Sequence, residues 1–122
     1  VLESSVKTPQ VSFNPDSGYF EIEGISVPED TIHFYSPVVE WLNNYVEQPA
    51  KFTKLVVRLA YLNTSSLQAF YEIFAVLSEG LPKESIGVEW HYIVGDSDMK
   101  EIGEDFQDAL DLDLKLVAVE SA

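Results

Sequence analysis

The stretch that decides the fold is LVVRLAYLNTSSLQAFYEIF, residues 55–74. Its first half continues an apolar, branched run from Phe52, interrupted by Lys54 and Arg58, which is typical of a strand in the middle of a sheet. Its second half repeats apolar residues at the spacing of one buried helix face. Between the halves stands a polar run, so the sequence predicts a hydroxyl-rich strand-to-helix junction at Asn63, Thr64, Ser65 and Ser66.

Hydrophobic periodicity and turn residues predict the elements on both sides of this junction. A helix is expected to take Ser36 as its N-cap and Pro37 as its first residue, and to end at Pro49. The other expected elements are strands at 10–13 and 19–25, a strand at 52–62, a helix with its stripe over 67–81, a strand at 86–94, a helix started by 95–98 and a strand through 112–119. The order β-β-α-β-α-β-α-β predicts an α/β fold, with one mixed sheet covered by helices.

Length and composition indicate one folded domain over residues 1–122. Apolar residues make up 46% of the chain and aromatic residues 12%, which excludes a disordered protein despite the charge. Periodicity assigns the larger aromatic side chains of the helices and strands to the core, namely Trp41, Tyr45, Phe70, Tyr71, Phe74 and Trp90.

Charge and cysteine content exclude several kinds of partner and several kinds of site. The 21 Asp and Glu outnumber the 7 Lys and Arg, and a net charge of -14 argues against nucleic acid or an anionic membrane as the main partner. With no cysteine, disulfides, thiolate nucleophiles and cysteine-based metal sites are excluded. No apolar run is long enough for a membrane span and the start does not resemble a signal peptide, so we expect a cytoplasmic protein.

The predicted junction offers a place for an anion. Strand ends often carry function in open α/β sheets, and the first N–H groups of a helix favour negative charge. A phosphate on Thr64, Ser65 or Ser66 would be stabilised there and would add about -1.5 to -2 charge. The alternative is that Asn63, Thr64 or Ser65 only caps the helix, which contributes about 1 kcal/mol.

A second feature is an acidic segment that contains eight carboxylates and only one basic residue, Lys100. A calcium loop is excluded because Glu101 stands where an EF-hand requires glycine. A solvated helix face, or recognition of a basic patch on another protein, explains the segment instead. Its carboxylates are Asp96, Asp98, Glu101, Glu104, Asp105, Asp108, Asp111 and Asp113.

The sequence supplies no convincing catalytic constellation. His33 and His91 lack the spacing of a helical metal pair, and nucleophile-elbow and phosphate-loop motifs are absent. We therefore predict a binding or regulatory protein with no metal and no cofactor. An enzyme using Thr64 or Ser65 as nucleophile would need a base within hydrogen-bond reach, and the two histidines are the first candidates.

The junction resembles that of STAS domains, in which Asp-Ser-Ser-Gly follows a buried strand and its first Ser is phosphorylated. Thr64 falls on that position, whereas Asn63 replaces the Asp and Ser66 replaces the Gly. The chain is more similar to the SiaC-type family of bacterial regulatory phosphoproteins, which is STAS-like. Motifs that carry this resemblance stand at 8–9, 26–30, 41, 59–66, 90–92 and 103–106.

The SiaC-type resemblance implies a non-enzymatic switch. A Ser/Thr protein kinase would phosphorylate Thr64, a PP2C-type phosphatase would remove the phosphate, and the unmodified protein would activate a diguanylate cyclase in cyclic-di-GMP and biofilm control. Partner-binding residues would be Arg58, Tyr61, Asn63, Thr64, Ser65 and Ser66. A STAS-type anti-sigma-factor antagonist would share the switch and differ only in its partner. A constitutive scaffold with a plain capped helix is a further alternative.

Overall fold

The computed structural model describes residue 5 and residues 7–120. The ends of the predicted domain, at 1–4, 6 and 121–122, lie outside the described residues. The chain runs through β1 (Gln10–Asn14), β2 (Tyr19–Ser26), α1 (Thr31–Tyr45), β3 (Thr53–Leu62), α2 (Thr64–Gly80), a 3₁₀ turn (Lys83–Ser85), β4 (Ile86–Ile93), α3 (Ser97–Ala109) and β5 (Leu114–Val119). The predicted α/β class and element order are confirmed.

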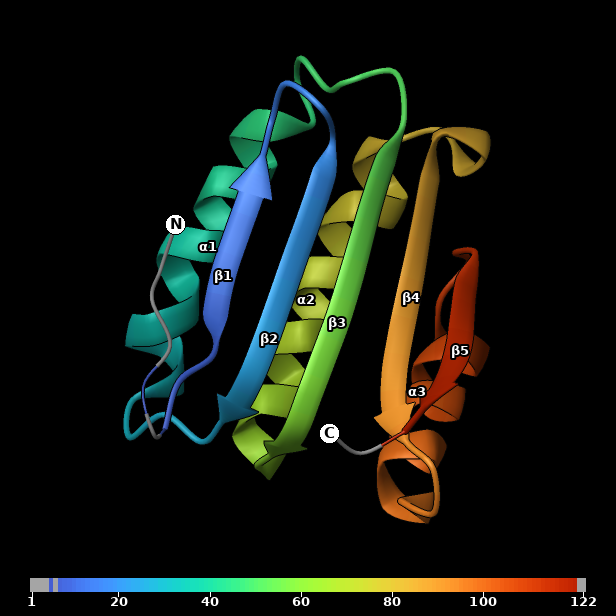
Figure 1. The fold of residues 1–122 in the computed structure, drawn as a ribbon. Coiled ribbons are helices and arrows are strands. Elements are labelled where there is room, and N and C mark those ends of the chain that lie inside the picture. Colours follow the sequence, from blue (N-terminus) through green and yellow to red (C-terminus); the bar gives the residue numbers. More distant parts are fainter. Residues whose placement is uncertain (1–4, 6, 121–122) are drawn as a thin grey trace.

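The five strands form one sheet in the order β1-β2-β3-β4-β5, with β3 in the middle. Only β1 and β2 are antiparallel, and each later strand runs parallel to the one before it. The connection between two parallel neighbouring strands is right-handed, and each of the three connections moves in the same direction across the sheet. All three helices therefore cover one face, as Figure 1 shows.

The first helix begins earlier than predicted. Asp30 caps α1, because its carboxylate accepts a hydrogen bond from the amide of His33, and Pro37 lies inside the helix. The predicted start at Ser36 and Pro37 is therefore wrong. Pro37 has no N–H to give to the carbonyl one turn earlier, and the buried face of α1 holds the helix together despite this loss. The helix ends at Tyr45, four residues before Pro49.

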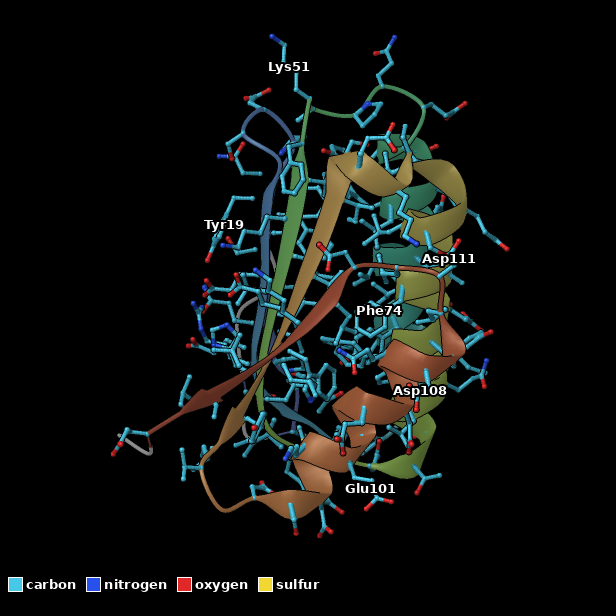
Figure 2. All side chains as sticks on the ribbon, turned by 90° about the vertical axis from the view of Figure 1, so that its right-hand side faces the viewer. Tyr19, Lys51, Phe74, Glu101, Asp108 and Asp111 are labelled. Atoms are coloured by element: carbon cyan, nitrogen blue, oxygen red, sulfur yellow. The ribbon has the colours of Figure 1, made fainter. Side chains whose placement is uncertain are left out.

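The core lies between the sheet and the helices, and its largest fully buried side chain is Trp90. Figure 2 shows Phe74 between the two layers and Tyr19 on the outer face of the sheet. Two of the predicted core aromatics are more exposed than expected. Tyr71 is 42% exposed on α2. Trp41 is 36% exposed, although its ring packs against Phe13, Phe20 and Tyr45.

The outer face of the sheet carries paired charges. Arg58 donates to Glu21 over 2.6 Å, and Lys54 lies 2.9 Å from Glu89, which also bonds to His91. Burial opposes ionisation of Glu21, but the bonds from Arg58 and Tyr19 outweigh it and hold its pKa below the usual range. Bonds from His91 and Lys54 likewise lower the pKa of Glu89.

We expect these pairs to make the fold sensitive to acid. A carboxylate whose pKa is lower in the folded state stabilises that state above its unfolded pKa, and this contribution is lost as the pH falls. The free energy of unfolding should therefore decrease as the pH falls below the ordinary glutamate value of 4.5. Urea titrations at a series of pH values measure this, and Glu89→Gln should flatten the decrease. An equal flattening by Glu79→Gln, at the exposed end of α2, would contradict the assignment to the pair.

Candidate functional site

Asn63 fixes the predicted junction by joining the end of β3 to the start of α2. Its N–H donates to the carbonyl of Ser26 over 3.0 Å, which holds it to the end of the neighbouring strand β2. Its side-chain oxygen caps α2 by accepting from the amide of Ser66 over 3.0 Å, and it also accepts from the Ser65 hydroxyl. Asn63 thus satisfies the cap alone, and the three hydroxyls that follow it are not needed for capping.

Ser66 belongs to a buried hydroxyl network. Its side chain is fully buried, and its Oγ lies 2.8 Å from the Oγ of Ser26 and donates to the Ser26 carbonyl. The Ser26 hydroxyl lies 2.5 Å from the phenol of Tyr35 in α1. Burial raises the pKa of Tyr35 to about 12, so the phenol stays protonated at neutral pH. Ser66 therefore ties α2 to β2 and α1 and presents no hydroxyl to solvent.

Ser65 and Thr64 differ from Ser66 because both are exposed. The Ser65 hydroxyl lies 2.6 Å from that of Thr31, the first residue of α1, and donates to Asn63. Among the described residues, the Thr64 hydroxyl has no hydrogen-bond partner. Of the three hydroxyls, that of Thr64 is thus the one that is both accessible and not engaged in holding the fold.

We expect Ser66→Ala to lower the free energy of unfolding by about 1–2 kcal/mol, because a buried hydroxyl bond is lost and Ser26 keeps only part of its network. Ser65→Ala is the matched control, and it should cost no more than about 0.5 kcal/mol because its bonds to Thr31 and Asn63 are exposed to water. Urea unfolding of both variants measures the difference. Equal losses in the two variants would show that the buried network does not stabilise the junction.

Sequence analysis also assigned Tyr61 and Arg58 to the site. Tyr61 lies near the end of β3 and is 57% exposed. Arg58 is bonded to Glu21 on the outer face of the sheet, opposite the helices. Arg58 is thus paired within the sheet, and its role in partner binding stays a prediction. Four of the seven basic side chains are held in such pairs, namely Lys7, Lys54, Arg58 and Lys83.

The histidines and the acidic segment also have definite places. His91 bonds to Glu89 on the outer face, and His33 is exposed in the first turn of α1. The five acids inside α3 are all exposed, as both the solvated-face interpretation and recognition of a basic partner require. Asp96 caps this helix by accepting from the amide of Met99. The described residues contain no group of three His, Asp or Glu placed to hold a metal ion, and none of their helices is long and apolar enough to cross a membrane.

Sequence reasoning missed the partners of the junction, Ser26, Thr31 and Tyr35. Ser26 lies in the motif at 26–30 and was given no role, and Tyr35 lies before the predicted helix start. The available signal was weak: a small polar residue ending an apolar strand, 40 residues from the serine that it contacts. Only the parallel pairing of β2 with β3 brings these two strand ends together.

Two grooves flank the exposed side of α2. One, of about 650 Å³, lies between α1 and α2 and includes Thr31 and Ser65. The other, of about 300 Å³, lies between α2 and α3 and begins at Leu67 and Gln68, one turn after Thr64. Ser65 thus lines the first groove, and the junction ends just before the second.

An α/β sheet with helices on one face and a free hydroxyl at a helix start fits a regulatory phosphoprotein, and a family model of that class matches residues 2–119. That family is the SiaC family, and the chain belongs to it. The resemblance seen in the sequence is thereby confirmed.

Individual proteins agree with this assignment. The chain is 29% identical over 111 residues to an uncharacterized protein of Pseudomonas aeruginosa (strain UCBPP-PA14), across 88% of this chain and 86% of that protein. It shares its fold with apo-SiaC from Pseudomonas aeruginosa, at a TM-score of 0.85 and 24% identity over 96% of each chain. A chain in the crystal structure of the diguanylate cyclase SiaD with its activator SiaC, also from Pseudomonas aeruginosa, has the same fold. Its TM-score is 0.88 and its identity 24%, over 97% of this chain and 98% of that one.

Proposed function

We propose that the chain is a non-enzymatic signalling protein switched by reversible phosphorylation of Thr64. In this proposal its unphosphorylated form binds and activates a diguanylate cyclase. A Ser/Thr protein kinase adds the phosphate and a PP2C-type phosphatase removes it. Membership of a family of regulatory phosphoproteins supports a switch, and the complex of SiaC with its cyclase supports the choice of partner.

The observation that carries the residue assignment is the contrast among the three hydroxyls. Ser66 is fully buried and bonded to Ser26, so a kinase would have to unfold the junction to reach it. Ser65 is accessible, but its hydroxyl joins α2 to Thr31 and Asn63. Thr64 is exposed at the first position of α2, where a phosphate would lie beside helix amides that have no carbonyl partner within the helix.

The same geometry supports a switch over catalysis. The Ser65 hydroxyl contacts another hydroxyl and an amide oxygen, and neither takes up a proton at neutral pH. His91, the histidine in the sheet, is bonded to Glu89 on the face away from the helices. A phosphate on Thr64 would change the formal charge from -14 to about -16 without breaking a hydrogen bond of the described residues.

The test is intact-mass spectrometry with site mapping on protein purified from its own cells, before and after phosphatase treatment. We expect one phosphate on Thr64 that phosphatase removes. Thr64→Ala should lose all kinase-dependent phosphate and keep the unfolding midpoint of the wild type, since Asn63 supplies the cap. Ser65→Ala is the matched control and should still be phosphorylated. Phosphate on Ser65 in the wild type would overturn the assignment to Thr64, and no phosphate under any growth condition would overturn the switch.

A further inference from the structure

The groove between α2 and α3 has an apolar floor that the fold leaves open. Its volume is about 300 Å³, and the surface inside it is almost entirely carbon. Tyr71, whose periodicity assigned it to the core, forms part of one wall and is 42% exposed. The residues that line the groove are Leu67, Gln68 and Tyr71 from α2 and Ile102, Asp105, Phe106 and Ala109 from α3.

The two walls of this groove differ in charge. On α3, four exposed acids follow one another at spacings of three or four residues, which places them along one side of the helix. Figure 2 shows two of them, Glu101 and Asp108, on the side of α3 away from the sheet. Asp105 lines the groove, and the other three acids extend it into an acidic edge along the exposed side of α3, formed by Asp98, Glu101, Asp105 and Asp108.

The α2 wall carries no charge, and Thr64 stands at its head. Leu67, Gln68 and Tyr71 follow Thr64 by three, four and seven residues, so all four side chains share one stripe of the helix. Ser65 begins a different stripe of α2, which continues with Ala69 and Glu72. These three residues line the groove between α1 and α2. Ser65 therefore lines the α1–α2 groove, whereas Thr64 lies on the stripe that continues into the α2–α3 groove one turn later, and Gln68 borders both grooves.

We propose that the α2–α3 groove is the docking site for an amphipathic helix of the diguanylate cyclase. Apolar side chains of that helix fill the floor, basic side chains lie along the acidic edge of α3, and uncharged side chains cover the stripe headed by Thr64. This inference rests on the proposed function and adds the surface and the chemistry of the partner segment.

Three features of the groove support this occupant. A groove between two helices matches the shape of a third helix, whose apolar face it buries. The acidic edge complements Lys and Arg, which speeds encounter and orients the partner. The uncharged α2 wall explains how a phosphate opposes binding although the partner is basic. The new dianion would enter the side of the groove where the partner is neutral, and it would lose water there without gaining a cation.

Hydrogen exchange with the purified full-length cyclase of the same organism tests the proposal. We expect the cyclase to slow exchange in residues 64–71 and 102–109 and to leave residues 31–44 unchanged. Binding with protection only at 31–44, or only on the sheet, would overturn the groove and leave the proposed function standing. If the cyclase does not bind the unphosphorylated chain, the proposed function fails and the inference fails with it. Protection of the groove without cyclase, in a chain that sediments as a dimer, would assign it to a second copy.

Matched substitutions give a second, quantitative test. Tyr71→Ser should weaken cyclase binding at least tenfold, and Ile32→Ser should change it less than threefold. Ile32 is 80% exposed in the α1–α2 groove, so the control removes an apolar side chain of the wrong groove. Thermal unfolding of both variants verifies that they remain folded at the assay temperature. Equal weakening by the two substitutions would overturn the proposal.

The acidic edge is tested by its dependence on salt. Neutralising Glu101, Asp105 and Asp108 together, to Gln, Asn and Asn, should slow association and remove most of its dependence on ionic strength. The control neutralises Glu40, Glu72 and Glu79 to Gln, which removes the same charge from α1 and from the other side of α2. An equal effect of the two triple variants would show that only net charge matters and would overturn the basic-helix assignment.

Discussion

Phosphorylation of Thr64 should weaken cyclase binding by about 100-fold or more, because burying a charge without a partner costs about 3–5 kcal/mol. Four of the seven Lys and Arg side chains that could offset this cost are already paired with carboxylates. Arg58 is bonded to Glu21 on the opposite face of the sheet, and Lys83 is bonded to Asp111. Thr64 itself lies on a helix stripe whose other members, Leu67, Gln68 and Tyr71, are uncharged.

Titration calorimetry of the phosphorylated and unmodified chains with the full-length cyclase measures this loss. Thr64→Val is the control for shape, since it keeps the branched side chain without the hydroxyl, and it should bind like the wild type. Thr64→Glu should give only part of the effect, because a carboxylate carries less charge and fewer oxygens than phosphate. Tighter binding of the phosphorylated chain would mean that the partner presents a cation to Thr64, and the proposed direction of the switch would be wrong.

Replacing Trp90 should have the largest effect on stability. Trp90→Ala should lower the free energy of unfolding by about 3–5 kcal/mol, the usual cost of deleting a large buried aromatic side chain. The indole is fully buried in β4, and its Nε1 donates to the carbonyl of Met99 at the start of α3 over 3.0 Å. Its ring also packs against the rings of Phe70, Phe74 and Phe106.

The control for this loss is the other tryptophan. Trp41 also touches three aromatic rings, but it is 36% exposed, so Trp41→Ala should cost less than half as much. Urea unfolding followed by far-UV circular dichroism measures both variants without relying on tryptophan fluorescence. Similar losses would mean that the buried contacts of Trp90 with Met99 and the three phenylalanines stabilise the fold no more than the half-exposed contacts of Trp41 do. Thr64 should still be phosphorylated in Trp90→Ala at temperatures where that variant is folded.

Local patterns predicted well what depends on neighbours in the chain. The branched run before Asn63 predicted the central strand, and β3 is central because three parallel crossovers advance from β2. Asn63 was one of three candidate caps, and only its bonds in the structure single it out. Pro37 misled the prediction of α1, because a proline is common at the first helical position but is tolerated later when packing holds the helix.

The features that the sequence did not predict depend on contacts between distant segments. Arg58 pairs with a glutamate of the neighbouring strand, 37 residues earlier in the chain, which no local spacing indicates. Tyr71 fits the apolar spacing of α2, yet it faces the gap between two helices whose separation depends on the whole fold. The buried bond between Ser26 and Ser66 likewise exists only because β2 and β3 end at the same edge of the sheet.

The spatial order of the strands equals their order in the chain, so the ribosome delivers the strands in the order in which they lie across the sheet. Every residue that shapes the hydroxyl junction, from Ser26 through Tyr35 to Ser66, has been made when α2 starts to emerge. The α2–α3 groove, in contrast, needs the chain through Ala109. A growing chain therefore acquires the proposed phosphorylation site well before the proposed docking groove, and a truncation after α2 would separate the two.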